Sequence, residues 1–409
     1  MLGRKGFLSF GLVLFCIALP AQAAKRDAFR IIEASQPVAR MLLNDFSSQV
    51  RLLSKNFDEN SKYAAILVPK RLLKKISHCA HEVTGHCGGF IDVTYESKAT
   101  PKTRARLLRV AKGLPSIGSA KPEIVQALKT VRAQNIEDFV KTLNANFKTR
   151  NAETQEGVLA AQWIRDTWAG MAKVAKKKFD MEGIEVELVP PPRGFKQPSV
   201  RIIIPGSEPS LPVVVLGGHL DSISRRETAP GADDDASGIS TLTEAFRVMI
   251  TQKIKPKAAI HIFGYAAEEY GLHGSRAIAE HYRQKAISMK GVMQLDMVAY
   301  PGKSKTVTFI TDYVDQNLTL WTQQVFGLYV GGDIRVARCG YACSDHASWH
   351  RYGFSTVMPA ESPLSQMNPR LHTPEDLWDE QLDAEFAAQF AKLAYAFAAE
   401  LSEAQHGAH

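Results

Sequence analysis

The sequence predicts an α/β protein whose main unit is a three-layer α/β/α sandwich around a mostly parallel, mixed sheet. From residue 119 onward, short apolar runs recur along the chain, segments with helical spacing separate them, and polar residues directly follow several of them. Apolar runs without alternation are typical of strands covered by helices on both faces. In such sheets the ligand site lies beyond the carboxyl ends of the strands.

Each expected element follows from the pattern of its residues. Strands are expected over short, mainly apolar runs: Val200–Ile204, Val213–Leu216, Ala258–Tyr265 and Gly291–Leu295. Helices are expected where apolar residues recur at helical spacing: Ala39–Leu53, Val158–Lys178, Gly238–Ile250, Leu272–Gln284 and Glu385–Leu401.

The chain is expected to contain a leader and two folded units. Residues 1–23 combine basic residues, an apolar run and small residues up to Ala23, which is typical of a secretory signal peptide. Residues 24–118 are expected to form a removable propeptide or a permanent accessory domain, with the propeptide favoured because the Lys- and Arg-rich linker offers protease sites. Residues 119–409 are long enough to form a separate large domain.

The net charge of +8 does not indicate a nucleic-acid partner. Residues 24–118 hold 17 Lys and Arg against 8 Asp and Glu, so the basic character lies outside the larger domain. No segment after the leader is apolar over a length that spans a bilayer. We therefore expect a monomeric, exported protein, extracellular or periplasmic, that binds neither nucleic acid nor membrane.

Four cysteines remain once the leader is removed. Exported proteins meet oxidising conditions, in which disulfides persist. The sequence separations suggest two local pairs, Cys79 with Cys87 and Cys339 with Cys343. The histidines beside the first pair are therefore expected to be polar turn residues rather than metal ligands.

Residues with metal-ligand chemistry stand just after the predicted strands. His219 and Asp221 follow the strand 213–216, and a histidine can bind a metal through one ring nitrogen while a carboxylate accepts a hydrogen bond from the other. Three consecutive aspartates that end at Asp235 lie in a Gly-flanked turn before a helix. Part of this acidity can cap the helix, but three adjacent acids favour a nearby cation.

The later strands add further candidates. Glu268 and Glu269 are neighbours after a strand and point in different directions, so one can bind a metal while the other acts as a base. Two histidines and three carboxylates fit two zinc ions that share a bridging carboxylate. These five potential ligands are His219, Asp234, Glu269, Asp296 and His372.

Six segments of the chain resemble, in the same order, segments of secreted bacterial leucyl aminopeptidases of the co-catalytic dizinc family. The likeness covers residues 120–403 and does not extend to the N-terminal part. It implies a zinc-dependent enzyme that removes apolar residues from peptides with a free amino end. The segments begin at Gly217, Gly231, Tyr265, Gln294, Cys339 and Asn368.

The resemblance also implies a role for each matched ligand. Asp234 would bridge the two zinc ions. Glu269 and His372 would complete the site of one ion, and His219 and Asp296 the site of the other.

The remaining roles concern the reaction. The zinc ions would lower the pKa of a shared water from 15.7 toward about 7, and Glu268 would take its proton as the resulting hydroxide attacks the peptide carbonyl. Asp221 would lie behind His219, and Asp235 would follow a cis peptide bond. Tyr341 would donate a hydrogen bond to the developing oxyanion.

An apolar specificity pocket is implied as well. Its matched lining residues are Met297, Ile310, Cys339, Tyr341, Cys343, Met358 and Leu371. The sequence departs from the family at Ala360, Leu364 and Met367, where aromatic residues are usual. Smaller or flexible side chains widen such a pocket, so leucine, methionine and phenylalanine substrates are expected.

Three alternatives remain open on the sequence. A carboxypeptidase needs a cationic clamp for the substrate carboxylate, and the only arginine inside the matched segments, Arg370, belongs to the aminopeptidase pattern itself. A glutaminyl cyclase would make one of the two histidine ligands dispensable. A non-catalytic binding protein would have lost a ligand or the base.

Asp345 and His346 suggest a catalytic dyad, but a structural role is favoured.

Overall fold

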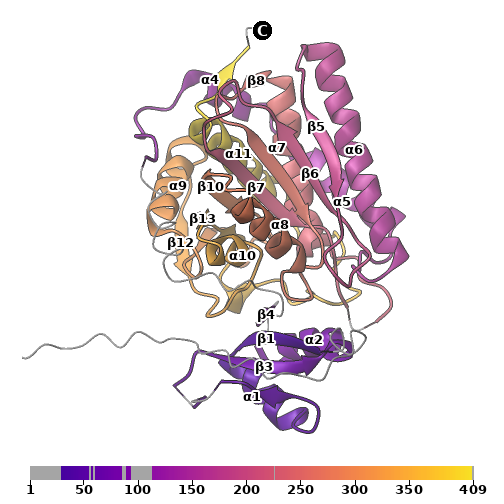
Figure 1. The fold of residues 1–409 in the computed structure, drawn as a ribbon. Coiled ribbons are helices and arrows are strands. Elements are labelled where there is room, and N and C mark those ends of the chain that lie inside the picture. Colours follow the sequence, from indigo (N-terminus) through magenta and orange to yellow (C-terminus); the bar gives the residue numbers. More distant parts are fainter. Residues whose placement is uncertain are drawn as a thin grey trace, which may run out of the picture.

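The computed structural model describes residues 29–54, 57–58, 60–84, 89–93, 113–224 and 226–407. A small N-terminal unit lies below a larger α/β unit (Figure 1). The predicted signal peptide, Cys87 and most of the predicted linker lie outside the described residues. The pairing of Cys79 with Cys87 therefore stays a prediction.

The larger unit is built on a six-stranded sheet with the order β13-β10-β7-β9-β6-β5. The first four strands of this order are parallel, and the last two are antiparallel to their neighbours. The predicted mixed sheet is confirmed. Its strands are β13 (Thr356–Val357), β10 (Met289–Gln294), β7 (Val213–His219), β9 (Ile260–Tyr265), β6 (Ser199–Ile204) and β5 (Glu185–Val189).

Helices cover both faces of this sheet, as the continuous apolar strands predict. Successive residues of β7 point to opposite faces, so Leu216 packs in one core and Val215 in the other. The first core includes α4 (Pro122–Leu128), α5 (Ala133–Asn146), α6 (Gln155–Phe179), α7 (Gly238–Thr251), α9 (Gln316–Tyr329) and α11 (Ala384–Leu401). The second core includes α8 (His273–Gln284) and α10 (His346–Arg351).

Smaller elements complete the larger unit. A three-stranded sheet has the order β12-β11-β14, with β12 (Ile334–Ala337), β11 (Val307–Ile310) and β14 (Pro359–Ala360). A two-stranded ribbon pairs β8 (Ile254–Lys255) with β15 (Gln405–His406).

The N-terminal unit packs two helices on a four-stranded antiparallel sheet of order β2-β3-β1-β4. Its strands are β1 (Phe29–Ser35), β2 (Arg51–Leu52), β3 (Tyr63–Pro69) and β4 (Phe90–Asp92), and its helices are α1 (Gln36–Asp45) and α2 (Leu73–Thr84).

The predicted helix over Ala39–Leu53 is too long. The helix ends at Asp45, and Arg51 and Leu52 pair with β3 instead. Asn, Asp and Ser in this stretch favour turns over helix, and the pairing partner lies too far along the chain for helical spacing to reveal it.

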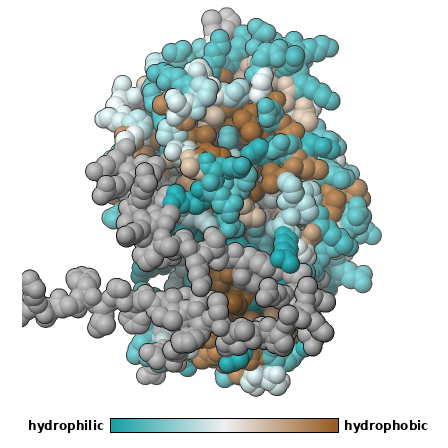
Figure 2. Space-filling view, in the orientation of Figure 1, coloured by the Kyte–Doolittle hydropathy of each residue, from teal (hydrophilic) through white to brown (hydrophobic). Residues whose placement is uncertain are grey.

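Within the described part of the chain, no helix combines the length and the apolarity needed to cross a bilayer. The face shown in Figure 2 carries hydrophilic residues along most of its outline, with hydrophobic groups between them.

Candidate active site

Three neighbouring parallel strands deliver candidate ligands to one edge of the main sheet. β7 ends at His219, the loop after β9 carries Glu269, and Asp296 follows β10. Because β10, β7 and β9 are parallel neighbours, their carboxyl ends meet at this edge. Asp234 reaches the same place from the turn that opens α7, and His372 from the loop before α11.

The five predicted ligands converge in two clusters that share Asp234. Nε2 of His219 lies 2.9 Å from Oδ1 of Asp234 and 3.4 Å from Oδ1 of Asp296. Nε2 of His372 lies 3.1 Å from Oδ2 of Asp234 and 2.8 Å from Oε2 of Glu269. Each oxygen of the Asp234 carboxylate therefore faces a different histidine. All five side chains are buried.

The charges of these clusters favour bound cations. Burial alone would lower the pKa of His372, but the carboxylates of Glu269 and Asp234 raise it to about 10. The buried carboxylates thus favour positive charge at this position. Oε1 of Glu269 and Oδ1 of Asp296 are buried, with no hydrogen-bond partner among the residues that the structure describes. Imidazole nitrogens and carboxylate oxygens are donors that zinc accepts, so the residues present fit this metal.

Asp235 is near enough to His219 to be considered a ligand, but its oxygens already have partners. Oδ2 accepts the main-chain N–H of His219 at 2.9 Å. Oδ1 accepts those of Gly238 at 2.8 Å and Met297 at 3.3 Å. The bond between Asp234 and Asp235 is a cis peptide, as the resemblance implies. Asp235 thus ties the ends of β7 and β10 to the first turn of α7.

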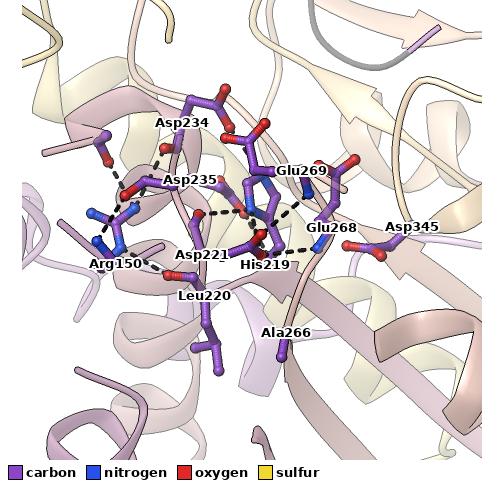
Figure 3. A network of polar contacts seen from close by, with 12 residues as sticks. Arg150, His219, Leu220, Asp221, Asp234, Asp235, Ala266, Glu268, Glu269 and Asp345 are labelled. Atoms are coloured by element: carbon purple, nitrogen blue, oxygen red, sulfur yellow. Dashed lines mark hydrogen bonds and ion pairs between the residues drawn. The ribbon is translucent and has the colours of Figure 1, made fainter. Parts of the chain in front are cut away.

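Asp221 connects His219 to the loop that carries the glutamates. Its carboxylate accepts the main-chain N–H groups of Glu268 at 2.9 Å and Glu269 at 3.2 Å (Figure 3). Nδ1 of His219 lies 3.1 Å from the Asp221 carbonyl oxygen and 3.6 Å from Oδ1. The partner of the ring is therefore chiefly this main-chain carbonyl rather than the expected carboxylate.

Glu268 belongs to neither cluster, so its carboxyl is available to accept and return a proton. In Figure 3 it lies between Glu269 and Asp345. Burial raises the pKa of the Glu268 carboxyl well above its usual range, against the effect of His219, and the Asp345 carboxylate adds to the rise. A buried carboxyl with a raised pKa suits a group that accepts and returns a proton near neutral pH.

Asp345 and His346 do not form a dyad. His346 is fully buried, and its Nε2 lies 3.1 Å from the carbonyl oxygen of Asp312. Asp345 instead lies 3.5 Å from the side-chain amide of Gln294, and burial raises its pKa to about 8. The two side chains therefore have separate surroundings.

Arg150 is a supporting residue that the sequence did not suggest. Its guanidinium is buried and donates hydrogen bonds to the carbonyl oxygens of Leu220 at 2.8 Å, Pro230, and Gly231 at 3.0 Å. These carbonyls belong to the segments that carry His219 and Asp234. A single arginine outside every motif gives no local signal of this role.

A layer of buried polar groups lies behind Asp234. The Asp376 carboxylate accepts the main-chain N–H groups of Asp233 at 3.0 Å and Asp234 at 3.2 Å. The amide of Asn368 donates to Asp233 at 3.1 Å. Burial raises the pKa of Asp376 well above its usual range and that of Asp233 to about 6. Asp376 could have been suspected, because it follows the segment that contains His372.

A mostly apolar pocket contains six of the seven predicted lining residues. Leu371 packs instead against Met297 in a small cluster next to it. Cys339 and Cys343 form the predicted disulfide in the pocket wall. Two polar residues, Glu361 and Ser362, were not predicted. The pocket is lined by Met297, Ile310, Cys339, Tyr341, Cys343, Met358, Ala360, Glu361, Ser362, Leu364 and Met367.

The covered sheet, the buried histidine–carboxylate clusters and the adjoining pocket define a metal-dependent hydrolase. Residues 200–398 match the model of peptidase family M28. The chain is also 33% identical over 334 residues to a probable leucine aminopeptidase of Trichophyton verrucosum, covering 79% of this chain and 87% of the relative. The chain therefore belongs to peptidase family M28, and it is a metallopeptidase of the aminopeptidase type.

Other comparisons agree with this assignment. Leucine aminopeptidase 1 of Phaeosphaeria nodorum is 32% identical over 330 residues, covering 77% of this chain and 82% of the relative. The crystal structure of the LapA aminopeptidase of Legionella pneumophila has a TM-score of 0.77 and 28% identity, and covers 91% of this chain and 98% of its own. The likeness to aminopeptidases thus extends to fungal as well as bacterial proteins.

A glutaminyl cyclase of Porphyromonas gingivalis shares the fold, with a TM-score of 0.52 and 17% identity over 65% of this chain and 97% of its own.

Proposed function

We propose that this chain is a secreted aminopeptidase that uses two zinc ions to remove single apolar residues from the free amino ends of peptides. The observation that carries the proposal is the position of Asp234, whose two carboxylate oxygens face His219 at 2.9 Å and His372 at 3.1 Å. A carboxylate held between two histidine sites is suited to bridge two metal ions.

The ligand sets follow from the distances in each cluster. Glu269, His372 and Asp234 would hold one zinc ion, while His219, Asp296 and Asp234 would hold the other. The charge balance also fits two ions. Two zinc ions would bring four positive charges and the three carboxylates bring three negative ones. One further anion, such as a hydroxide, would make the site neutral.

The chain's own residues then handle the proton. When bound, the zinc ions supply Lewis-acid chemistry that makes a water acidic near pH 7 and polarises the peptide carbonyl. Glu268 takes a proton from the attacking water and delivers it to the leaving amine, a contribution of roughly 10² to 10⁴-fold. Asp221 holds the main chain of Glu268 in place through its N–H group. Tyr341 donates a hydrogen bond to the carbonyl oxygen as it becomes negative.

The pocket supports a preference for apolar amino-terminal residues. Its wall is mainly aliphatic and sulfur-containing, and it lies beside Met297, which directly follows the ligand Asp296. Leu364 and Met367 are flexible lining residues, and methionine adapts its shape to different ligands. We expect leucine, methionine and phenylalanine to be accepted, and a free substrate amine to interact with the metal centre.

The main rival within the fold is a glutaminyl cyclase with a single metal ion. Such an enzyme would need only one of the two clusters. Here Nε2 of His219 in the second cluster lies 2.9 Å from Asp234 and 3.4 Å from Asp296, which favours the aminopeptidase. A non-catalytic binding protein is disfavoured because Glu268 and all five ligands are present.

Hydrolysis of leucine p-nitroanilide tests the proposal. The purified protein should release nitroaniline, lose this activity in a chelator, and regain it on addition of zinc. The same samples are offered an amino-terminal glutaminyl peptide and a peptide with a blocked amino end. Cyclisation of glutamine without release of leucine would replace the proposal with the cyclase, and equal cleavage of the blocked peptide would exclude an aminopeptidase.

A further inference from the structure

The N-terminal unit contacts the outer side of two loops of the candidate active site. One loop, Ala266–Leu272, carries Glu268 and Glu269, and the other, Cys339–Cys343, carries Tyr341. We propose that residues 29–93 remain part of the active enzyme, with Ser77 and Tyr63 as positioning residues for these loops. This inference rests on the proposed function and revises the expectation that favoured a removable propeptide.

Ser77 of α2 holds the loop that carries the glutamates. Its hydroxyl donates a hydrogen bond of 2.6 Å to the carbonyl oxygen of Glu269, and both groups are buried. Glu269 therefore has its side chain in the ligand cluster and its main chain bound to the N-terminal unit. Residues of this unit contribute to neither ligand cluster in the described part of the chain, so its contacts support the ligands from behind.

The same loop has a backbone that needs support. Ala267 and Leu272 adopt left-handed conformations, with φ of 55° and 60°, which are unfavourable for residues other than glycine. Between them, Gly271 accepts the main-chain N–H of Asp92 at 3.4 Å and lies so close to β4 that a Cβ atom would come within 3.0 Å of Phe90. Surrounding contacts of this kind keep strained conformations in place.

A buried cluster of polar and charged side chains joins the two units next to this loop. Asp92 of β4 is fully buried and lies 3.5 Å from Arg30 of its own unit. It also lies 3.3 Å from His273 and 3.7 Å from Arg276, both in α8 of the larger unit. Asp92 thus ties β4 to the first turn of α8, directly after the loop that carries the glutamates.

Apolar packing between the units is continuous. The core of the N-terminal unit includes Ile76 and Phe90, and it extends without interruption to Phe195, Ala267 and Tyr270 of the larger unit. A unit that is meant to leave would expose this apolar surface to water.

Tyr63 of β3 makes the second connection. Its ring packs against the cluster that includes Cys339 and Tyr341, which line the specificity pocket. Its hydroxyl donates a hydrogen bond of 3.3 Å to the carbonyl oxygen of Gly340, between the two disulfide cysteines. The N-terminal unit thus supports the loop that shapes the pocket as well as the loop that carries the base.

The LapA crystal structure extends over the N-terminal unit as well as the larger unit. It covers 91% of this chain, whereas residues 119–409 are only 291 of the 409 residues. The matched structure therefore includes a counterpart of much of the N-terminal unit.

The first test cuts the chain between the units. A recognition sequence for a specific protease is placed at residues 100–106, and the folded full-length protein is then cleaved and passed over a sizing column. We expect both fragments to elute together and kcat/KM for leucine p-nitroanilide to be at least that of the uncut protein. The proposal is overturned if the larger fragment elutes alone and is as active as the uncut protein.

The second test removes single contacts. Ser77→Ala should lower kcat by about 10-fold with little change in KM, and should weaken the binding of one zinc ion by about 10-fold in a chelator competition. Tyr63→Phe should instead raise KM for leucine p-nitroanilide by about 3-fold at unchanged kcat. Ser54→Ala is the matched control, since its hydroxyl accepts the N–H of Ala65 within the same unit.

The zinc measurement separates this proposal from the proposed function. If the wild-type protein binds zinc but shows no aminopeptidase activity, the proposed function fails, while zinc binding by Ser77→Ala and co-elution of the cut fragments still decide the present inference. Unchanged zinc affinity and unchanged kcat in Ser77→Ala would show that Ser77 positions nothing.

Discussion

Oδ1 of Asp234 lies 2.9 Å from Nε2 of His219, although the two residues stand on different elements of the chain. His219 ends a central strand, while Asp234 belongs to the turn before α7. The second oxygen of the same carboxylate is directed to His372. One side chain therefore connects two ligand clusters, and this is the arrangement from which a two-metal centre follows.

Glu268→Gln should reduce kcat for leucine p-nitroanilide by at least about 100-fold, because an amide cannot accept the proton of the attacking water. Metal content should not change, since Glu268 belongs to neither ligand cluster. Steady-state kinetics and metal analysis on the same preparation check both statements. A fully metallated variant with wild-type turnover would exclude Glu268 as the base.

Arg150→Met should destabilise the protein by about 3 to 5 kcal/mol, because it leaves several buried carbonyl oxygens without a charged donor. These carbonyls include those of Leu220 and Gly231. Thermal unfolding measures the effect. Arg335→Met, at an exposed position of β12, is the control and should stay close to wild type. Equal stability of both variants would show that Arg150 does not support these loops.

Ala360→Phe should narrow the specificity pocket, since Ala360 is a buried lining residue. We expect kcat/KM for phenylalanine p-nitroanilide to fall by about 10-fold or more, and that for alanine p-nitroanilide to change much less. The ratio of the two values corrects for differences in the amount of active enzyme. If the ratio stays constant, this pocket does not hold the amino-terminal side chain.

Acid should destabilise the fold through the buried His346. Burial lowers the pKa of His346 from 6.5 to about 3. Between these values the unfolded chain binds the proton and the folded chain does not, so stability decreases as pH falls from 6.5 toward 3 by up to about 1.4 kcal/mol per pH unit.

His346→Gln removes this contribution and should flatten the pH dependence of the unfolding free energy in that range. Denaturant unfolding at equal zinc concentration measures the slope. His281→Gln, at an exposed position, should keep the wild-type slope. An unaltered slope in His346→Gln would mean that this histidine does not stay neutral in the folded protein.

Much of the fold and of the candidate site could be predicted from local patterns. Continuous apolar strands predicted the covered sheet, and polar residues directly after those strands predicted the edge where His219 and Asp296 meet. The rule that ligands gather at the carboxyl ends of parallel strands needs only the order of elements. His219, Glu268, Glu269 and Asp296 therefore had a signal in the strand just before them, whereas the role of His372 followed from the resemblance of its segment.

The supporting residues had no such signal. Arg150 binds the carbonyl oxygen of Leu220, 70 positions further along the chain. Ser77 reaches the carbonyl oxygen of Glu269 over 192 positions. Both bind main-chain atoms, which any residue type offers, so neither partner marks the contact in its sequence. The end of α1 at Asp45 was missed for a similar reason, because pairing with a distant strand decides it.

Zinc titration of the metal-free protein tests the central claim most directly. We predict that activity toward leucine p-nitroanilide rises until two equivalents of zinc are bound per chain, and that His219→Ala and His372→Ala each retain no more than one tightly bound zinc ion. Full activity at a single equivalent, with either histidine variant unaffected in zinc binding, would contradict the two-zinc centre.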